Sequence, residues 1–284
     1  MRDSGAPRPI RIGHSPDPDD AFMFYGLAKG LIPTPGYAIV QILQDIETLN
    51  RMALEGAIEV TAVSIHAYAH LADRYALLSC GASMGDGYGP IVVTREPAGP
   101  ASLKDMTIAV PGRLTSAVLA LRLALGEVRT EVMPFDRILD AVRRGEQPAG
   151  LLIHEGQLTY GAGGAGLHKA LDLGAWWKER TGLPLPLGGN VIRRDLGPGV
   201  MRDVAGLLRR SIAFGLEHRA DALTYALDFG RGLRRDLADR FVGMYVNDAT
   251  LDYGPEGRRA VQAFLDAGHE AGIIPQRVEV VFEG

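Results

Sequence analysis

A histidine ends one of the most apolar stretches of the sequence. The segment 151–160 reads LLIHEGQLTY, in which three aliphatic residues lead directly to His154 and Glu155. Histidine changes its charge near neutral pH, so it is the side chain best suited to moving protons. The pattern predicts a general base, His154, at the carboxyl end of a strand, with Glu155 either orienting it or facing water. The alternative is a histidine that packs in the core or in a turn.

A pair of hydroxyl groups stands where a helix is expected to begin. In VPGRLTSAVLAL (110–121), a strand and a Pro-Gly turn lead through Arg113 to Thr115 and Ser116. Hydroxyls backed by free helix N–H groups suit a carboxylate or a phosphate, and Arg113 could add positive charge. The segment therefore predicts an anion site, and the alternative is simple helix capping by Thr115.

Two more turns have a comparable form. In HSPDPDD (14–20), a strand ends, two prolines stiffen the turn and a helix begins. Ser15 would then lie at the carboxyl end of a strand, where open α/β sheets bind ligands; the alternative is a rigid turn with Asp19 as the N-cap. Ser64 ends the strand-like VTAVS (60–64) and presents the same choice between an anion site and a helix cap.

The elements that would position these residues alternate along most of the chain. Short apolar runs such as 107–110 precede amphipathic stretches such as 116–125, and one long helical stretch is expected to follow Ser64 over 65–78. This alternation predicts α/β layers with mostly parallel sheets. From residue 199 to about 282 the apolar residues keep a helical period, so helices are expected there.

Two loop-rich segments divide the chain. TREPAGPASL (94–103) and LPLPLGGN (183–190) bracket the central α/β part. We predict an outer lobe formed by residues 1–95 and 191–284, with residues 96–190 inserted as a second lobe. A cleft between lobes is a favoured place for a ligand.

Composition excludes several classes of function. The net charge is −4 and no Lys/Arg-rich run occurs, so nucleic acid is not an expected partner. The single cysteine, Cys80, excludes an internal disulfide and a cysteine-based metal cage. No apolar run reaches the roughly 18 residues of a membrane span, and residues 1–20 contain no signal-peptide core. We expect a cytoplasmic protein that acts on a small molecule.

Three other patterns carry less weight. GAGGAG (161–166) matches G-x-G-x-x-G, but no long helix follows it, so a flexible loop is expected rather than a dinucleotide site. His66 and His70 have a spacing that can bind zinc, yet no HExxH accompanies them, so they are interpreted as surface or packing residues. The adjacent tryptophans 176 and 177 could wall a pocket or pack the junction between lobes.

Several segments taken together resemble one known family. These segments are SPDPDDAFMFY, DIETLNRMALEG, IHEGQLTY, DLGAWWKERTGLPLPLG and YVNDATLDYGPEGRRAV. They are similar to the 1,4-dihydroxy-6-naphthoate synthases, and the resemblance covers nearly the whole chain. It implies an α/β two-lobe fold like that of periplasmic binding proteins, with a ligand cleft between the lobes.

The resemblance also implies an activity. The implied enzyme is a carbon–carbon lyase of the futalosine route to menaquinone. It converts cyclic dehypoxanthinylfutalosine, an anionic small molecule, to 1,4-dihydroxy-6-naphthoate and dihydroxyacetone. No metal or organic cofactor is implied. The family's base matches His154, and its substrate contacts match the residues Ala62, Val63, Ser64, Thr115 and Ser116. The mechanism then predicts that the anion site and the base face each other across the cleft.

The sequence departs from the family pattern at two places. The first turn is expected to read SPCPNDTF, so that Asp17, Asp19 and Ala21 replace Cys, Asn and Thr. Two additional carboxylates facing the cleft would weaken the binding of an anion. Ala62 and Val63 stand where the family has Lys and Leu, which removes a positive charge.

Three other functions fit the same sequence. A solute-binding protein would have this fold without catalysis, and the pathway's chorismate dehydratase would have it with a different substrate. A regulatory ligand-binding domain is the third, although no DNA-binding segment accompanies it.

Overall fold

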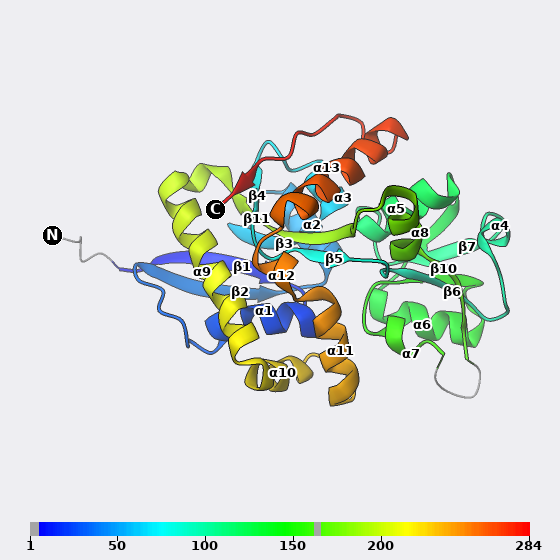
Figure 1. The fold of residues 1–284 in the computed structure, drawn as a ribbon, viewed down its shortest axis with the longest axis horizontal. Coiled ribbons are helices and arrows are strands. Elements are labelled where there is room, and N and C mark those ends of the chain that lie inside the picture. Colours follow the sequence, from blue (N-terminus) through cyan, green and yellow to red (C-terminus); the bar gives the residue numbers. More distant parts are fainter. Residues whose placement is uncertain (1–5, 162–165) are drawn as a thin grey trace.

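The structure is a computed structural model, and it describes residues 6–161 and 166–284. Residues 162–165 of the GAGGAG segment lie outside this range, so the expected loop there is not described. Two β-sheets organise the described residues, and Figure 1 shows them side by side. The part of the chain built on the first sheet is named the first lobe, and the part built on the second sheet is named the second lobe.

The first sheet has the strand order β12-β4-β11-β3-β1-β2, with β5 paired to β11. Its strands are β1 (Arg8–His14), β2 (Tyr37–Leu43), β3 (Val60–Ser64), β4 (Tyr75–Leu78), β5 (Ser83–Gly85), β11 (Leu185–Arg193) and β12 (Phe282–Glu283). The second sheet has the order β10-β6-β9-β7-β8. Its strands are β6 (Ile91–Thr94), β7 (Thr107–Val110), β8 (Arg129–Val132), β9 (Ala149–Leu152) and β10 (His168–Asp172).

The expectation of mostly parallel sheets was wrong. Strand β1 pairs in parallel with β2 and β3, and β7 does so with β8 and β9. Strand β11, however, runs antiparallel to β3, β4 and β5, and β6 runs antiparallel to β9 and β10. The cause lies in the connections between lobes, because β6 and β11 are the first strands after each crossing and enter their sheets in the opposite direction.

Helices cover both sheets and fill the C-terminal part of the chain, as the helical period predicted (Figure 1). In the first lobe they are α1 (Pro18–Ala28), α2 (Ile46–Leu54), α3 (Ile65–Tyr68), η1 (Arg194–Leu196), α9 (Pro198–Glu217), α10 (Arg219–Leu227), α11 (Arg235–Tyr245), α12 (Asp248–Leu251) and α13 (Gly254–Glu270). In the second lobe they are α4 (Pro100–Leu103), α5 (Ser116–Leu125), α6 (Phe135–Arg144), α7 (Gly156–Thr159) and α8 (Leu173–Thr181). Among the described helices, none is both long enough and apolar enough to cross a membrane.

The single helix expected over 65–78 was wrong. Only Ile65–Tyr68 is helical, and Tyr75–Leu78 forms β4. An apolar run as short as YALL fits a buried strand as well as a helix. The ladders to β11 and β12 decide between the two, since β4 pairs with both neighbours.

The two lobes share part of their core. One cluster of buried residues includes Val63 of β3, Val110 of β7 and Leu119 of α5. Trp177 belongs to it as well; its indole lies edge-on to Phe264 at 5.2 Å and donates its N–H to the Pro184 carbonyl at 3.2 Å. Trp177 therefore packs the junction between the lobes, which was one of the two alternatives for the tryptophans.

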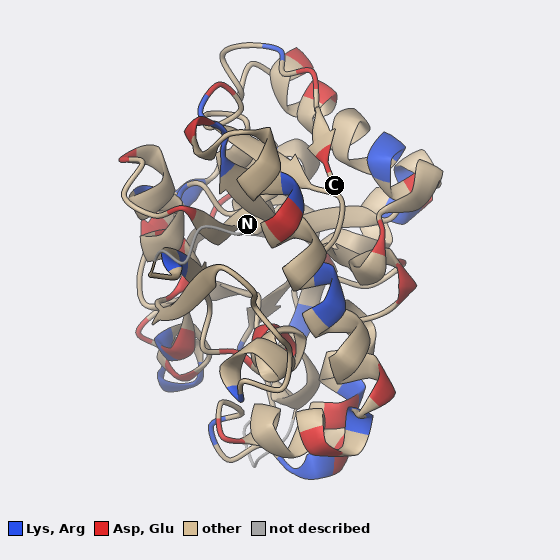
Figure 2. Ribbon diagram, turned by 90° about the vertical axis from the view of Figure 1, so that its left-hand side faces the viewer, with Lys and Arg blue, Asp and Glu red and all other residues tan. Residues whose placement is uncertain are grey.

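The strand pairing locates the crossings between sheets. The chain leaves the first sheet after β5 and enters the second at β6, so the first crossing lies within 86–90. It leaves the second sheet after β10 and returns to the first at β11, so the second crossing lies within 173–184. The division into residues 1–95 with 191–284 and residues 96–190 stays a prediction. Figure 2 shows the acidic and basic residues of one side interspersed along the ribbon.

Candidate functional site

A cavity lies where the strands of the two lobes end. It is lined by all but two of the residues proposed from the sequence, namely Ser15, Ala62, Val63, Ser64, Thr115 and Ser116. Its volume is about 110 Å³, which is smaller than the roughly 300–1,000 Å³ usual for small-molecule sites. Residues of both lobes line it, including Ser15 and Asn190 of the first lobe and Ala117 of the second.

The β1–α1 turn supplies one wall of the cavity. The Ser15 N–H donates to Asp20 Oδ2 at 2.7 Å, and the Ser15 hydroxyl donates to Asp17 Oδ2 at 2.5 Å. Asp17, Asp19 and Asp20 all line the cavity, so the two acidic departures do face inward. The expected N-cap was wrong by two positions, because α1 begins at Pro18 and Asp17 is its N-cap residue.

Burial changes the acidity of two of these carboxyls. It raises the pKa of Asp20 to about 7, with the charge of Asp17 adding to the effect and the Ser15 N–H opposing it. Burial also raises the pKa of Asp19 well above its ordinary value, and the neighbouring carboxylates Asp20 and Asp17 raise it further. Near neutral pH, therefore, this wall carries less negative charge than its three carboxyl groups suggest.

The end of β3 supplies the opposite edge. Its pairing with β1 stops at Thr61, and the last three residues of the strand, Ala62 to Ser64, line the cavity. The side-chain amide of Asn50 in α2 makes two hydrogen bonds to Ser64. Asn50 Oδ1 accepts the Ser64 N–H at 2.9 Å, and Asn50 Nδ2 donates to Ser64 Oγ at 3.2 Å. Ser64 is the N-cap residue of α3, but its hydroxyl does not accept a hydrogen bond from the first turn of that helix.

The two hydroxyls that begin α5 are engaged within the protein. Thr115 caps the helix as expected, since its Oγ1 accepts the Val118 N–H at 3.3 Å and donates to the Gly112 carbonyl at 3.1 Å. Ser116 Oγ donates to the Leu187 carbonyl at 2.5 Å and accepts the His66 N–H at 3.2 Å, which joins the second lobe to the first. What α5 offers the cavity is thus its first backbone N–H groups.

Two of the proposed residues do not line the cavity. Arg113 is exposed, so its part in anion binding stays a prediction. His154 is 7% exposed and directly follows Ile153, which does line the cavity. The histidine follows β9, as expected from its position after the apolar run.

Hydrogen bonding assigns the proton on the neutral His154 ring. The Gly156 N–H donates to Nδ1 at 2.9 Å, so Nδ1 presents its lone pair and the proton lies on Nε2. Nε2 is buried and has no hydrogen-bond partner within residues 6–161 and 166–284. Glu155 Oε2 lies 3.7 Å from Nδ1. It is the carboxylate placed to accept a hydrogen bond from Nδ1–H when the ring uses its other tautomer.

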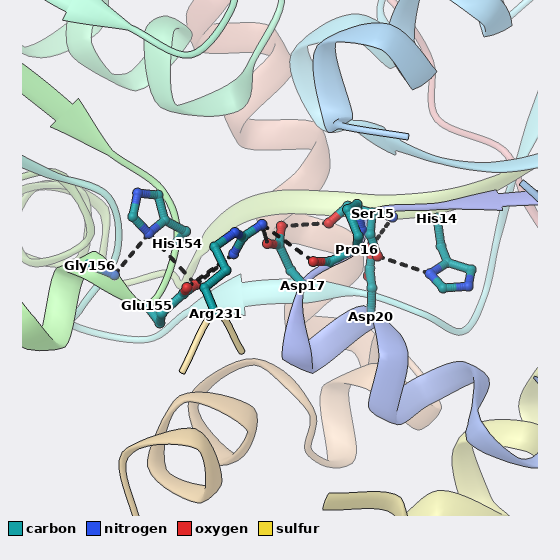
Figure 3. A network of polar contacts seen from close by, with 9 residues as sticks. All are labelled: His14, Ser15, Pro16, Asp17, Asp20, His154, Glu155, Gly156 and Arg231. Carbon is teal, nitrogen blue, oxygen red and sulfur yellow. Dashed lines mark hydrogen bonds and ion pairs between the residues drawn. The ribbon is translucent and has the colours of Figure 1, made fainter. Parts of the chain in front are cut away.

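Figure 3 shows a polar network that connects this histidine to the β1–α1 turn, with Arg231 in the middle. Arg231 Nη1 donates to Glu155 Oε1 at 3.0 Å, and Nη2 donates to Asp17 Oδ1 at 2.8 Å. Burial raises the pKa of Glu155, but a protonated His154 ring and the Arg231 guanidinium outweigh burial and leave that pKa below its ordinary value. Sequence reasoning missed Arg231, which stands in a loop far along the chain from both carboxylates.

Asn190 of β11 also escaped sequence reasoning. It lines the cavity opposite Ala62 in the ladder, and its Nδ2 donates to the Gly81 carbonyl at 3.2 Å. That bond fixes the orientation of the amide, and it leaves Oδ1 buried with no partner in the part of the chain that the structure describes. The only sequence signal was its place at the end of the proline- and glycine-rich segment 183–190.

The two histidines of this pair divide between the expected roles, because His66 is buried and His70 is exposed. His66 is 3% exposed, and its Nδ1 lies 3.3 Å from the Thr115 carbonyl. Burial lowers the pKa of His66 to about 4, and this loss of basicity is consistent with a neutral ring in the junction between lobes.

Comparison with known proteins assigns the chain to a family. The family model described as "Menaquinone biosynthesis" matches residues 10–270. The chain belongs to this family. It is 45% identical over 265 residues to a protein of Thermus thermophilus named 1,4-dihydroxy-6-naphthoate synthase, covering 93% of this chain and 95% of the relative. A Streptomyces coelicolor protein of the same name is 36% identical, with 94% and 95% covered. The resemblance stated from the sequence, and the expectation of an enzyme, are confirmed.

Solved structures confirm the fold. A protein of Archaeoglobus fulgidus superposes with a TM-score of 0.89 at 48% identity, covering 93% of this chain and 98% of that one. The alkanesulfonate-binding protein of Xanthomonas axonopodis superposes with a TM-score of 0.70 at 15% identity and covers 98% of both chains. This second likeness shows the two-lobe fold of periplasmic binding proteins and no more.

Proposed function

We propose that the chain is a 1,4-dihydroxy-6-naphthoate synthase that cleaves cyclic dehypoxanthinylfutalosine and releases dihydroxyacetone, with His154 as the general base. The observation that supports this best is the gathering of the residues expected from the sequence to bind a substrate. Ser15, Ala62–Ser64 and the start of α5 come from both lobes and line one cavity, and Ile153, which also lines it, directly precedes the histidine. We expect the enzyme to work in the cytoplasm and without a metal or organic cofactor.

The cavity offers a separate place for each end of the substrate. The benzoate carboxylate would accept hydrogen bonds from the free N–H groups of Ser116 and Ala117 at the start of α5. Asn190 Oδ1 would accept a hydrogen bond from a hydroxyl of the sugar-derived part. The inward-facing carboxyls are compatible with an anion, because Arg231 pairs with Asp17 and burial raises the pKa of Asp19 and Asp20, which reduces their negative charge.

The reaction needs a proton removed so that a carbon–carbon bond of the sugar part can break and the new ring can become aromatic. A base must offer a lone pair, and the Gly156 contact leaves the proton of the neutral ring on Nε2. We propose that the substrate favours the other tautomer, in which Nδ1–H turns from Gly156 to the Glu155 carboxylate 3.7 Å away and Nε2 becomes the base. Closure of the lobes would exclude water from the intermediate.

The test is turnover by the purified protein. Wild type should form the naphthoate from cyclic dehypoxanthinylfutalosine, followed by chromatography, and His154→Ala should bind the substrate in calorimetry without converting it. His168→Ala is the matched control, because His168 is an exposed histidine in the same lobe. If wild type binds the compound and leaves it unchanged, a solute-binding function is favoured. Conversion of chorismate instead would identify the sister dehydratase.

A further inference from the structure

The loop between α10 and α11 places an arginine in an unusual conformation. Arg231 has a φ of 50°, and it stands between Gly230 and Gly232. Side chains other than glycine rarely adopt positive φ, and such strain persists where the surroundings hold the residue in place. The contacts of the Arg231 side chain show what holds it.

The guanidinium group of Arg231 is bound on both sides of the cleft. In the first lobe, Nη2 donates to Asp17 Oδ1 at 2.8 Å and to the Pro16 carbonyl at 3.3 Å. In the second lobe, Nη1 donates to Glu155 Oε1 at 3.0 Å and to Oε2 at 3.3 Å. The guanidinium carbon also lies 4.8 Å from the ring centre of Phe135, within the range of a cation–π contact.

Both second-lobe partners of Arg231 touch the His154 ring. The Phe135 ring meets the imidazole edge-on, with the ring centres 5.5 Å apart. Glu155 Oε2 lies 3.7 Å from Nδ1. The Arg231 side chain thus contacts both Glu155 and Phe135, the two residues that lie against the imidazole. Figure 3 shows the contacts that run from His154 through Glu155 and Arg231 to Asp17.

We propose that Arg231 is a positioning residue for His154: it holds Glu155 and Phe135 against the imidazole, and its bond to Asp17 makes this arrangement complete only when the lobes are closed. The inference rests on the proposed role of His154 and adds a link between closure and the state of the base. Asp17 serves as the first-lobe anchor of Arg231.

The chemistry of the contacts requires arginine. One planar group reaches two carboxylates in different lobes and also lies over an aromatic ring. A lysine ammonium is a single point charge and can satisfy only part of this set. We therefore expect Arg231→Lys to recover a fraction of the function that Arg231→Gln loses.

The experiment compares variants by kcat and KM separately. Arg231→Gln should lower kcat at least about 10-fold, since small displacements of a catalytic group cost up to about 100-fold in rate. Asp17→Asn should lower it less, because the contact to Glu155 survives. Arg234→Gln is the control, because Arg234 belongs to the same loop and pairs with Asp236, two residues further along the chain, at 2.9 Å.

A spectroscopic readout separates positioning from general damage. Nitrogen-15 NMR distinguishes the two histidine tautomers, and the His154 signals are assigned by their loss in His154→Ala. In Arg231→Gln these signals should shift while Arg234→Gln leaves them unchanged. If Arg231→Gln unfolds, Arg231→Lys and Asp17→Asn give the same comparison in folded protein.

The outcomes distinguish this inference from the proposed function. If His154→Ala keeps full turnover, the role of the base fails whatever Arg231 does. If His154 is essential but Arg231→Gln has a wild-type kcat and unshifted His154 signals, the positioning role alone is overturned. A change confined to KM would overturn it as well, because it would make Arg231 a substrate contact.

Discussion

The Asp20 carboxyl in the cavity wall should make the stability of this protein depend on pH. Its ordinary pKa is 3.8, and burial raises it to about 7. The folded protein therefore keeps a proton that the unfolded chain has already lost, so the free energy of unfolding falls as the pH rises through this range. Each pKa unit corresponds to about 1.4 kcal/mol, which puts the full cost of an ionised Asp20 at about 4 kcal/mol.

The substitution Asp20→Asn removes this titration and keeps a carbonyl oxygen for the Ser15 N–H. The variant should be more stable than wild type by a margin that grows with pH, from about 2 kcal/mol near pH 5 to about 4 kcal/mol near pH 8. Urea unfolding followed by tryptophan fluorescence measures this margin, since Trp177 is buried in the folded state.

This prediction has a control variant and an outcome that would contradict it. Asp73→Asn changes an exposed aspartate on the turn before β4 and controls for the loss of one carboxyl group from the chain. If the difference between Asp20→Asn and wild type stays constant across the range, Asp20 does not titrate there. The reduced negative charge proposed for this wall near neutral pH would then be wrong.

Two further substitutions test the cavity and the junction. Asn190→Leu should raise KM about 10-fold or more with a smaller effect on kcat, measured in steady-state assays, because the amide oxygen proposed to bind a substrate hydroxyl is lost. An unchanged KM would remove Asn190 from the substrate site. Ser116→Ala breaks the bonds to the Leu187 carbonyl and the His66 N–H. It should lower the free energy of unfolding by about 2–4 kcal/mol in urea, and a smaller loss would show that water replaces the hydroxyl.

Local signals predicted the parts of the site that adjoin regular elements. Thr115 has the residue type and position of an N-cap, and the structure confirms the cap. Ser15 follows β1 and Ser64 ends β3, so the rule that α/β sheets bind ligands at the carboxyl ends of strands predicted their place at the cavity. In each case a few neighbouring residues suffice, because capping and strand termination are decided within one turn of chain.

The features that the sequence did not predict depend on contacts between residues far apart in the chain. Arg231 is 76 positions from Glu155 and 214 from Asp17, and an arginine between two glycines gives no sign of either partner. Strand β4 looked helical because its four apolar residues fit both periods, and only the ladders to β11 and β12 distinguish them. The direction of β11 likewise depends on where the chain returns from the second lobe.

The residues HEG that end the apolar run act as one unit. Leu151 and Leu152 are fully buried and fix β9 in the second sheet, which places Ile153 at the cavity and turns His154 back into the protein. Gly156 then donates its N–H to the imidazole at 2.9 Å, and a Cβ at this position would come within 2.6 Å of the ring. Only glycine permits this approach, and Glu155 between them supplies the carboxylate for the other tautomer. The histidine is thus held between two partners that favour opposite protonation patterns, and the residue that fixes one of them, Arg231, belongs to the opposite lobe.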